Sequence, residues 1–248
     1  MQIHSSNSIK LKKYFEGIIM NIEELYDRKY YLDRDYLPIH LQNAIENIFI
    51  QNNFHNILEV GVGTGRLMNS LRDKGYNVKG IDSSPIAAEM TGAAIGDATS
   101  IPFENESFDC VLGISIIEHL NEKDGLVFIK EIYRVLKKGG GVFLVTPNYS
   151  SPLRIIQGNN WYAYTDKTHL FYYTPKSLSN LLKINGFNKI KFTFKLKALP
   201  NFWPAEWPMG LIFKKLPKFF KHIPYRILIS SPLGLYRDTF WIFGRKVL

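Results

Sequence analysis

The chain has 248 residues, of which 46% are hydrophobic, and it carries a formal net charge of +9. This length suits one α/β domain with additions, and the single cysteine, Cys110, excludes an intramolecular disulfide framework. No uncharged apolar stretch is long enough to predict a transmembrane helix, and the apolar run at 17–20 is too short for a signal peptide, so we expect a cytoplasmic protein.

Two helices are predicted ahead of the first strand. The spacing of apolar side chains predicts them over residues 14–26 and 37–51. Because both precede the first strand, we expect them to cover the carboxyl edge of a sheet as a helical cap that comprises residues 1–53.

From residue 54 onward, segments with the pattern of strands alternate with segments with the pattern of helices. Short apolar runs predict strands over 56–60, 77–81, 93–95, 108–114 and 141–147, and helical spacing predicts helices over 66–74, 86–90 and 126–136. This alternation is typical of an α/β fold with a doubly wound, mostly parallel sheet.

The chain then adds one more helix and two more strands. Helical spacing over 177–185 stops at Gly186, a residue type that favours the end of a helix. Residues 189–197 alternate apolar side chains with lysine and threonine, which predicts a half-buried strand, and 239–247 predict the last strand.

Three glycines, Gly61, Gly63 and Gly65, lie between the first predicted strand and the helix that follows it. Glycine lets the backbone approach a ligand without a clash at Cβ, and nucleotide-like ligands bind at this place in open α/β sheets. Glu59, inside the strand, would repel a pyrophosphate and suits a ligand with an ammonium group. Glu59 and the glycine spacing therefore disfavour a nicotinamide dinucleotide.

The second predicted strand ends in Asp82, about one βα unit after the glycines. A carboxylate at this position is placed to accept hydrogen bonds from two ribose hydroxyls. Alternatively, Asp82 caps the next helix, with Ser83, Ser84 and Pro85 behind it. The neighbouring glycine loop favours ribose binding, and the two roles are compatible.

At these residues the chain resembles the class I S-adenosylmethionine-dependent methyltransferases, of the type 11 and type 23 kind. The resemblance covers residues 54–187 and rests on several motifs in the order of that family. They include Leu-Glu-Val-Gly-Val-Gly-Thr-Gly at 58–65, Gly-Ile-Asp at 80–82, Gly-Asp-Ala at 96–98, Ile-Glu-His-Leu at 117–120 and Leu-Lys-Lys-Gly-Gly at 136–140. It implies a Rossmann-like sheet of seven strands, with the last strand antiparallel, and S-adenosyl-L-methionine as cofactor.

The resemblance also implies how the adenine would be bound. Asp97 would accept a hydrogen bond from the adenine amino group, and the backbone amide of Ala98 would donate one to the ring. Ile101 and Phe103 would then pack on the adenine face. Alternatively, Asp97 is the acid of a turn, and the apolar residues belong to the core.

The fourth strand ends in Ile114 and Ser115, whose backbone would, by the same resemblance, face the methionine part of the cofactor. Glu118 and His119 follow at this edge. Some quinone-ring O-methyltransferases resemble the chain here and use this neighbourhood as base or metal ligand, and histidine suits proton transfer near neutral pH. Two adjacent ligands are too few to predict a metal. His119 equally well fixes the geometry of its loop.

A second candidate base lies in the aromatic segment 161–171. Its Asp-x-x-His pattern, Asp166 to His169, resembles a branch of methyltransferases linked to sugar, lipid and cell-surface metabolism. His169 is a candidate general base that Asp166 orients. Alternatively, His169 bonds to the loop backbone and holds it in place.

The excess positive charge is confined to the C-terminal quarter. Residues 189–248 contain 12 Lys or Arg and 2 Asp or Glu, whereas the remainder contains 19 and 20. Segment 198–237 interleaves aromatics, lysines and prolines outside the minimal fold. This composition suits three alternative roles: binding to an anionic membrane surface, covering a lipophilic or anionic substrate, or packing on the core with solvated lysines. No nucleic-acid partner is expected, because no recognised module is present.

We therefore predict one domain with four parts: a cap (1–53), a core (54–197), a basic aromatic insertion (198–237) and a final strand (238–248). The predicted activity is methyl transfer to a small molecule, glycan or lipid-like acceptor, with O-methylation favoured and with peripheral membrane contact. A non-catalytic cofactor-binding or membrane-associated assembly protein is the alternative. The identity of the acceptor and the oligomeric state do not follow from the sequence.

Overall fold

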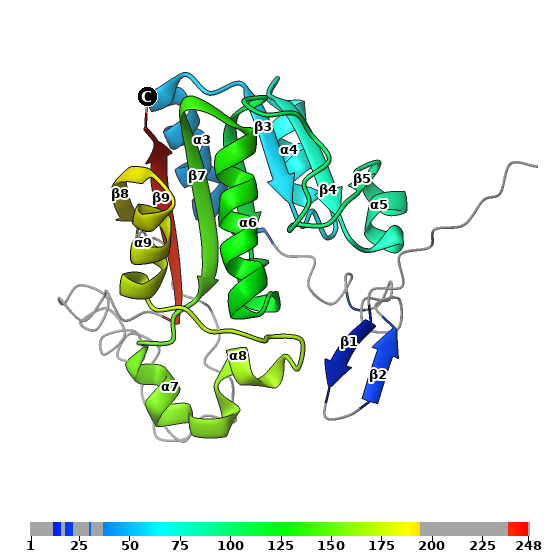
Figure 1. Cartoon of the computed structure of the whole chain (residues 1–248), viewed down its shortest axis with the longest axis vertical. Helices are drawn as coiled ribbons and strands as arrows, with labels where there is room; N and C mark the ends of the chain where they lie inside the picture. Colours follow the sequence, from blue (N-terminus) through cyan, green and yellow to red (C-terminus); the bar gives the residue numbers. More distant parts are fainter. Residues whose placement is uncertain (1–11, 16–17, 22–29, 31–36, 194–237, 248) are drawn as a thin grey trace, which may run out of the picture.

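The computed structural model describes residues 12–15, 18–21, 30, 37–193 and 238–247. In this part of the chain, one seven-stranded sheet lies between helices (Figure 1). The predicted insertion, 198–237, lies outside the described residues, as does the end of the strand predicted over 189–197. The division of the chain into four parts stays a prediction.

The sheet has the strand order β5-β4-β3-β6-β7-β9-β8. Its strands are β3 (Asn56–Val60), β4 (Asn77–Asp82), β5 (Ala94–Ile95), β6 (Phe108–Ile114), β7 (Leu136–Pro147), β8 (Phe187–Thr193) and β9 (Thr239–Lys246). Neighbours from β5 to β7 pair in parallel, and β9 pairs antiparallel with both β7 and β8. The predicted doubly wound, mostly parallel sheet with an antiparallel last strand is confirmed.

The order in which the chain adds strands reverses at β3. The chain runs from β3 through β4 to the edge strand β5, and then crosses back to β6 on the other side of β3. In doubly wound sheets, ligands bind beyond the carboxyl ends of the strands at such a switch point. The topology therefore places a site beyond the ends of β3 and β6.

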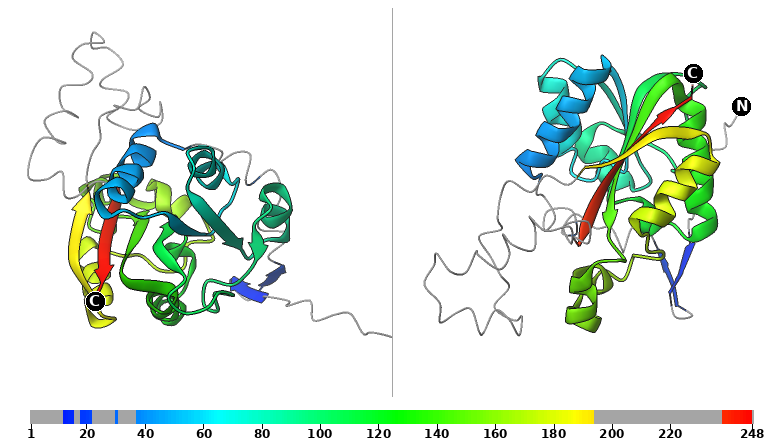
Figure 2. Two further views of the ribbon diagram at one scale, coloured as in Figure 1. Left: turned by 90° about the horizontal axis from the view of Figure 1, so that it is seen from above. Right: turned by 90° about the vertical axis from the view of Figure 1, so that its left-hand side faces the viewer.

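Helices cover both faces of the sheet (Figures 1 and 2). The buried side chains of α3 (Ile39–Asn52) and α4 (Arg66–Asp73) join one apolar cluster, and those of α6 (Glu122–Val135) and α9 (Pro175–Ile184) join another. The prediction that the helix before β3 covers the carboxyl edge is wrong. The apolar stripe of α3 packs against a face of the sheet, where it contacts more apolar surface than an edge offers.

Where the described residues overlap the helix predicted over 14–26, the structure has two paired strands instead; residues 16–17 and 22–26 lie outside the described residues. β1 (Lys12–Phe15) pairs antiparallel with β2 (Ile18–Asn21), and Phe15 lies opposite Ile18. Two β-branched residues at the start of β2 favour a strand, and the two residues between the strands include a glycine, as is common in hairpins. These local preferences outweigh the helical spacing of the apolar residues.

Short helices follow the strands at the carboxyl edge. α5 (Pro85–Thr91) follows β4, and the 3-10 helix η1 (Ile117–His119) follows β6. Between β7 and α9 come α7 (Pro152–Gln157), η2 (Gly158–Asn160) and α8 (Tyr162–Thr165), which lie below the sheet in Figure 1. None of the described helices has the length and apolar content that crossing a bilayer requires.

Candidate functional site

A cavity of about 1140 Å³ lies at the carboxyl edge of the sheet. Its wall comes from the loop after β3, the end of β4, the loop after β5, the end of β6 with η1, and residues 162–170. The structure brings the predicted site residues together here. The predicted cofactor-binding and catalytic residues line this cavity except Gly65, Ile101 and Phe103.

The loop after β3 contains glycine where its backbone requires it. Gly61 and Gly65 have φ values of 74° and 73°, in the left-handed region that favours glycine. A Cβ on Gly65 would lie 2.7 Å from Cγ2 of Thr91 in α5, so α4 and α5 meet closely at this point. Gly65 is the N-cap of α4 and supports the wall from behind.

Asp82 holds the glycine loop. Its carboxylate accepts hydrogen bonds from the backbone N–H groups of Gly63 at 3.0 Å and Ser84 at 2.9 Å. Burial raises its pKa, and these hydrogen bonds oppose the rise. Ser84 is the N-cap of α5, so the alternative in which Asp82 caps this helix is wrong. The proposed contact with a ribose stays a prediction.

Glu59 is a buried acid in the cavity wall. Its side chain is 3% exposed, and its Oε2 accepts no hydrogen bond from the described residues. Burial, and secondly the charge of Asp82, raise the pKa of Glu59 to about 8. A buried carboxyl oxygen without a partner is costly, and a cationic ligand group in the cavity would relieve that cost.

Asp97 has one oxygen engaged in its own turn and lies in the cavity wall. Its Oδ1 accepts hydrogen bonds from the N–H and the hydroxyl of Thr99, each at 2.7 Å. The structure corrects the placement of two neighbours. Ile101 is in the core, and Phe103 packs edge-on against Phe108, so neither is among the described residues that line the cavity.

The end of β6 is strained where it meets the cavity. Ser115 has φ 52°, which is uncommon for a residue with a side chain, and its N–H donates to the carbonyl of Val145 at 2.9 Å. Such strain is often found at functional sites. Ile114 and Ser115 both line the cavity. Their place near the methionine part of a cofactor stays a prediction.

Glu118 connects η1 to β7 and to the segment after α8. It is 1% exposed; its Oε2 accepts from the hydroxyl of Thr146 at 3.0 Å, and its backbone carbonyl accepts from the N–H of Leu170 at 2.8 Å. Burial raises its pKa to about 8. Glu118 therefore fixes both histidine-bearing segments, a role that the sequence pattern did not indicate.

His119 is oriented through Thr168. The Thr168 hydroxyl donates to Oδ1 of Asp166 at 2.6 Å, so the contact of 2.8 Å between Thr168 Oγ1 and His119 Nδ1 requires the imidazole to donate. In the neutral ring the lone pair is then on Nε2. Thr168 was not among the predicted site residues, because only the folded chain brings it to His119.

His169 is oriented by the backbone. Its Nδ1 lies 2.7 Å from the carbonyl oxygen of Ala163, which only accepts, so Nδ1 carries the proton. Oδ2 of Asp166 lies 4.0 Å from Nε2 of His169. Asp166 therefore orients His119 through Thr168, whereas its carboxylate and the His169 ring form an ion-pair contact.

The electrostatics of Asp166 agree with this role. Burial raises the pKa of Asp166, but two hydrogen bonds from Thr168 and the nearby His169 and His119 outweigh burial and lower it. The carboxyl group is therefore ionised, and an ionised acceptor strengthens the hydrogen bonds that lead to His119.

Glu118, His119 and His169 also form a group that could hold a metal ion. One ligand atom from each lies within 4.8 Å of the others. Two imidazoles and a carboxylate are a common ligand set for zinc. The adjacent pair Glu118 and His119 alone did not predict a metal; the third ligand, His169, comes 50 residues after His119 in the sequence.

The segment between β7 and α9 is held against the start of β9. Asp238 accepts hydrogen bonds from the hydroxyl of Ser151 at 2.7 Å and from Nε1 of Trp161 at 3.1 Å. Trp161 is fully buried and packs against Tyr149 and Tyr164. This packing places Asp166 and His169 over the carboxyl edge of the sheet.

The chain is similar to known methyltransferases in sequence and in fold. A family model described as a methyltransferase domain matches residues 28–191. A tocopherol O-methyltransferase from Arabidopsis thaliana is 30% identical over 183 residues, which are 64% of this chain and 51% of that protein. A ubiquinone biosynthesis O-methyltransferase from Rattus norvegicus is 28% identical over 187 residues, 61% of this chain and 54% of that protein. The chain thus spans about half the length of these relatives.

Solved structures show the same fold. A SAM-dependent methyltransferase from Archaeoglobus fulgidus superposes with a TM-score of 0.62 at 18% identity, over 89% of this chain and 100% of that one. The family model covers more than half of the chain, and the strand order of the sheet fits the fold of the solved methyltransferase. The chain therefore belongs to the S-adenosylmethionine-dependent methyltransferases.

Proposed function

We propose that this protein transfers the methyl group of S-adenosylmethionine to a hydroxyl oxygen of a small-molecule, glycan or lipid-like acceptor. The observation that supports oxygen is the pair His119 and His169, whose rings lie 4.7 Å apart at the cavity wall. A hydroxyl loses its proton when it is methylated, and a histidine can accept that proton near neutral pH. The two relatives described above are both O-methyltransferases by name.

The described residues fit the cofactor. The buried carboxyl of Glu59 suits the ammonium of the methionine part, Asp82 suits the ribose, and Asp97 with Ala98 suits the adenine. When bound, S-adenosylmethionine supplies a methyl group on a sulfonium, which is already a strong electrophile. The protein's remaining task is to align the acceptor and to take its proton.

S-adenosylmethionine and its demethylated product are expected to raise the melting temperature of the protein, whereas NAD is not. A ligand at about 100 times its dissociation constant adds roughly 2.7 kcal/mol to the free energy of unfolding. Differential scanning fluorimetry with the three ligands measures this. Stabilisation by NAD together with none by S-adenosylmethionine would overturn the proposed cofactor site. If S-adenosylmethionine stabilises the protein, transfer of its isotope-labelled methyl group to cell extracts is the experiment that identifies the acceptor.

Replacing Asp82 with Ala is expected to weaken cofactor binding and to lower the stability of the glycine loop. The variant loses the acceptor of the Gly63 and Ser84 amides as well as the proposed ribose contact. Hydrogen bonds to a charged group contribute about 1.5–3 kcal/mol. Calorimetry of S-adenosylhomocysteine binding tests this, with Ser84→Ala, which loses only the cap of α5, as the matched control. Equal affinities of Asp82→Ala and the wild type would leave Asp82 a purely structural residue.

The proposed contact with an anionic membrane rests on the basic aromatic insertion, 198–237. This segment lies outside the described residues, so the charge pattern of the sequence is its only support.

A further inference from the structure

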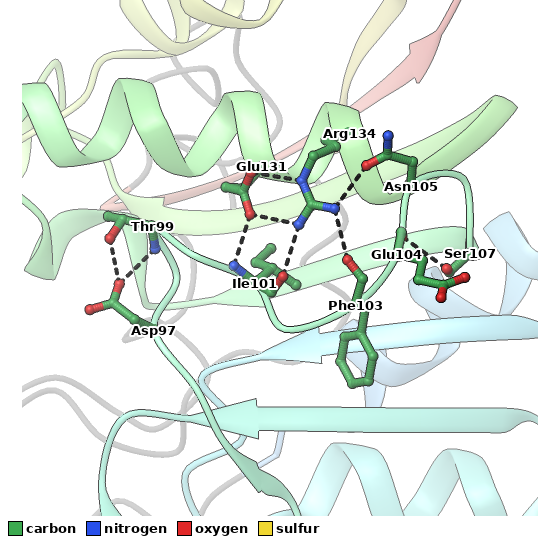
Figure 3. Close-up of polar contacts among 9 residues, drawn as sticks. All are labelled: Asp97, Thr99, Ile101, Phe103, Glu104, Asn105, Ser107, Glu131 and Arg134. Carbon is green, nitrogen blue, oxygen red and sulfur yellow. Dashed lines mark hydrogen bonds and ion pairs between the residues drawn. The ribbon is translucent and has the colours of Figure 1, made fainter. Parts of the chain in front are cut away.

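Glu131 and Arg134, one turn apart on α6, form an ion pair that also binds the loop between β5 and β6 (Figure 3). Nε of Arg134 donates to Oε1 of Glu131, and a terminal nitrogen donates to Oε2, each at 2.8 Å. This two-point contact fixes the plane of the guanidinium. It also lowers the pKa of Glu131 and raises that of Arg134, so both groups are charged.

The other donors of Arg134 all reach the loop. Arg134 donates to the carbonyls of Ile101 at 2.8 Å and Phe103 at 2.7 Å, and to Oδ1 of Asn105 at 3.0 Å. With the two bonds to Glu131, the five N–H groups of the guanidinium have five acceptors. Lysine, with one ammonium on a flexible chain, has no equivalent geometry.

Glu131 also contacts the loop directly. Its Oε2 also accepts from the N–H of Ile101 at 2.8 Å, so the pair binds both backbone polar groups of this residue. Ile101 is 3% exposed and packs in the same apolar cluster as Ala98, which lines the cavity. A displacement of Ile101 would therefore move the cavity wall at Ala98.

The middle of the loop has no other hydrogen bonds to the rest of the described chain. Backbone hydrogen bonds hold its two ends, from Gly96 to Asp82 and from Ser107 to Val135. Between them, residues 97–105 contain neither helix nor strand, and apart from the bonds to Glu131 and Arg134 their described hydrogen bonds lie within the loop, such as the turn of Asp97 with Thr99. Ordinary ion pairs on a helix surface contribute little. This pair differs because each member binds the backbone of a segment that forms part of the cavity.

We propose that Glu131 and Arg134 are positioning residues for the adenine end of the cofactor site. They act through Ile101 and Phe103, which hold Asp97 and Ala98 in place. The inference rests on the proposed function, in which Asp97 and Ala98 bind the adenine. The two histidines belong to other segments, so loss of the pair raises the KM for S-adenosylmethionine and leaves kcat at saturating cofactor nearly unchanged.

The test compares Arg134→Gln, Arg134→Lys and Glu131→Gln with the wild type by calorimetry of S-adenosylhomocysteine, at a temperature where circular dichroism shows each protein to be folded. We expect dissociation constants roughly tenfold higher for all three variants, with no rescue by lysine. Lys137→Gln is the matched control, because Lys137 forms an ion pair with Asp109 at 2.7 Å and neither residue lines the cavity. We expect this variant to bind S-adenosylhomocysteine as the wild type does.

A double-mutant cycle separates positioning from general stability. If the pair acts through the loop, Arg134→Gln and Asp97→Ala have less than additive effects on affinity, whereas Lys137→Gln and Asp97→Ala are additive. Lower melting temperatures with wild-type affinity, or additive effects of Arg134→Gln and Asp97→Ala, would overturn the inference and leave the proposed function standing. A wild-type protein that does not bind S-adenosylhomocysteine would overturn the proposed function itself.

Discussion

Replacing His119 or His169 with Ala is expected to lower the turnover number with a hydroxyl acceptor by roughly 10²–10⁴-fold, the range typical for a general base. Cofactor affinity should change much less, because neither ring belongs to the residues proposed to bind the cofactor. Both histidines line the cavity, and in each ring the Nδ1–H donates a hydrogen bond that fixes the orientation of the ring. Single-turnover kinetics at saturating S-adenosylmethionine measure the effect on chemistry directly.

Because different groups orient the two rings, one substitution can distinguish whether His119 or His169 is the base. Thr168→Val removes the hydroxyl that connects His119 to Asp166 while it keeps the shape of the side chain. If His119 is the base, this variant should lose much of the rate; if His169 is the base, it should not. His55→Ala is the control, because His55 is exposed and is not among the cavity-lining residues.

A chelator distinguishes a base from a metal ligand. If Glu118, His119 and His169 hold a metal, removal of the metal should lower activity and added zinc should restore it. Activity that is unchanged by the chelator but lost in a histidine variant supports proton transfer. Full activity of both histidine variants across pH would leave alignment alone as the mechanism.

The sequence predicted the core of the fold well because its strands are buried on both faces. β3 and β6 begin and end at the predicted residues, since apolar runs in a parallel sheet end where polar loops begin. β7 starts five residues earlier than predicted, at Leu136, because Leu136 pairs with Phe108 of β6. The lysines and glycines between Leu136 and Gly141 lie at an irregularity of this pairing and carry no strand pattern. The hairpin of β1 and β2 shows the opposite error, in which apolar spacing was given more weight than short-range strand preference.

The residues proposed to bind the cofactor follow from the sequence more readily than the contacts around the two histidines. Glu59, the glycine loop and Asp82 follow one another along two adjacent strands, so local pattern locates them. The acceptor side depends on contacts distant in sequence, such as Thr146 with Glu118 and Trp161 with Asp238. Short sequence patterns do not predict such pairs. The loop position set by Glu131 and Arg134 was missed for the same reason.

Replacing Glu59 with Gln is expected to make the protein without cofactor more stable at pH 8 than the wild type while it weakens cofactor binding. The folded protein keeps the Glu59 proton up to about pH 8, whereas the unfolded chain releases it near the usual 4.5. Between these values the folded state binds more protons, so the free energy of unfolding of the wild type falls as the pH rises. From pH 4.5 to above pH 8 this decline is on the order of 5 kcal/mol, and the Gln variant lacks the decline because its side chain does not titrate.

Calorimetry gives a second signature of Glu59. At pH 7 the carboxyl is mostly protonated in the free protein, and an ammonium group that binds beside it favours the charged form. Binding of S-adenosylhomocysteine should therefore release close to one proton, seen as a dependence of the observed enthalpy on the ionisation enthalpy of the buffer. Glu59→Gln should abolish this dependence and weaken binding by about tenfold or more.

Glu118→Gln is the matched comparison, because burial also raises the pKa of Glu118 to about 8 but its Oε2 already accepts from Thr146. This variant should change the pH dependence of stability in the same direction and leave the proton release on cofactor binding intact. Proton release that persists in Glu59→Gln, or affinity equal to that of the wild type, would show that Glu59 does not receive the ammonium group. The unpaired Oε2 would then be a cost to stability that cofactor binding does not relieve.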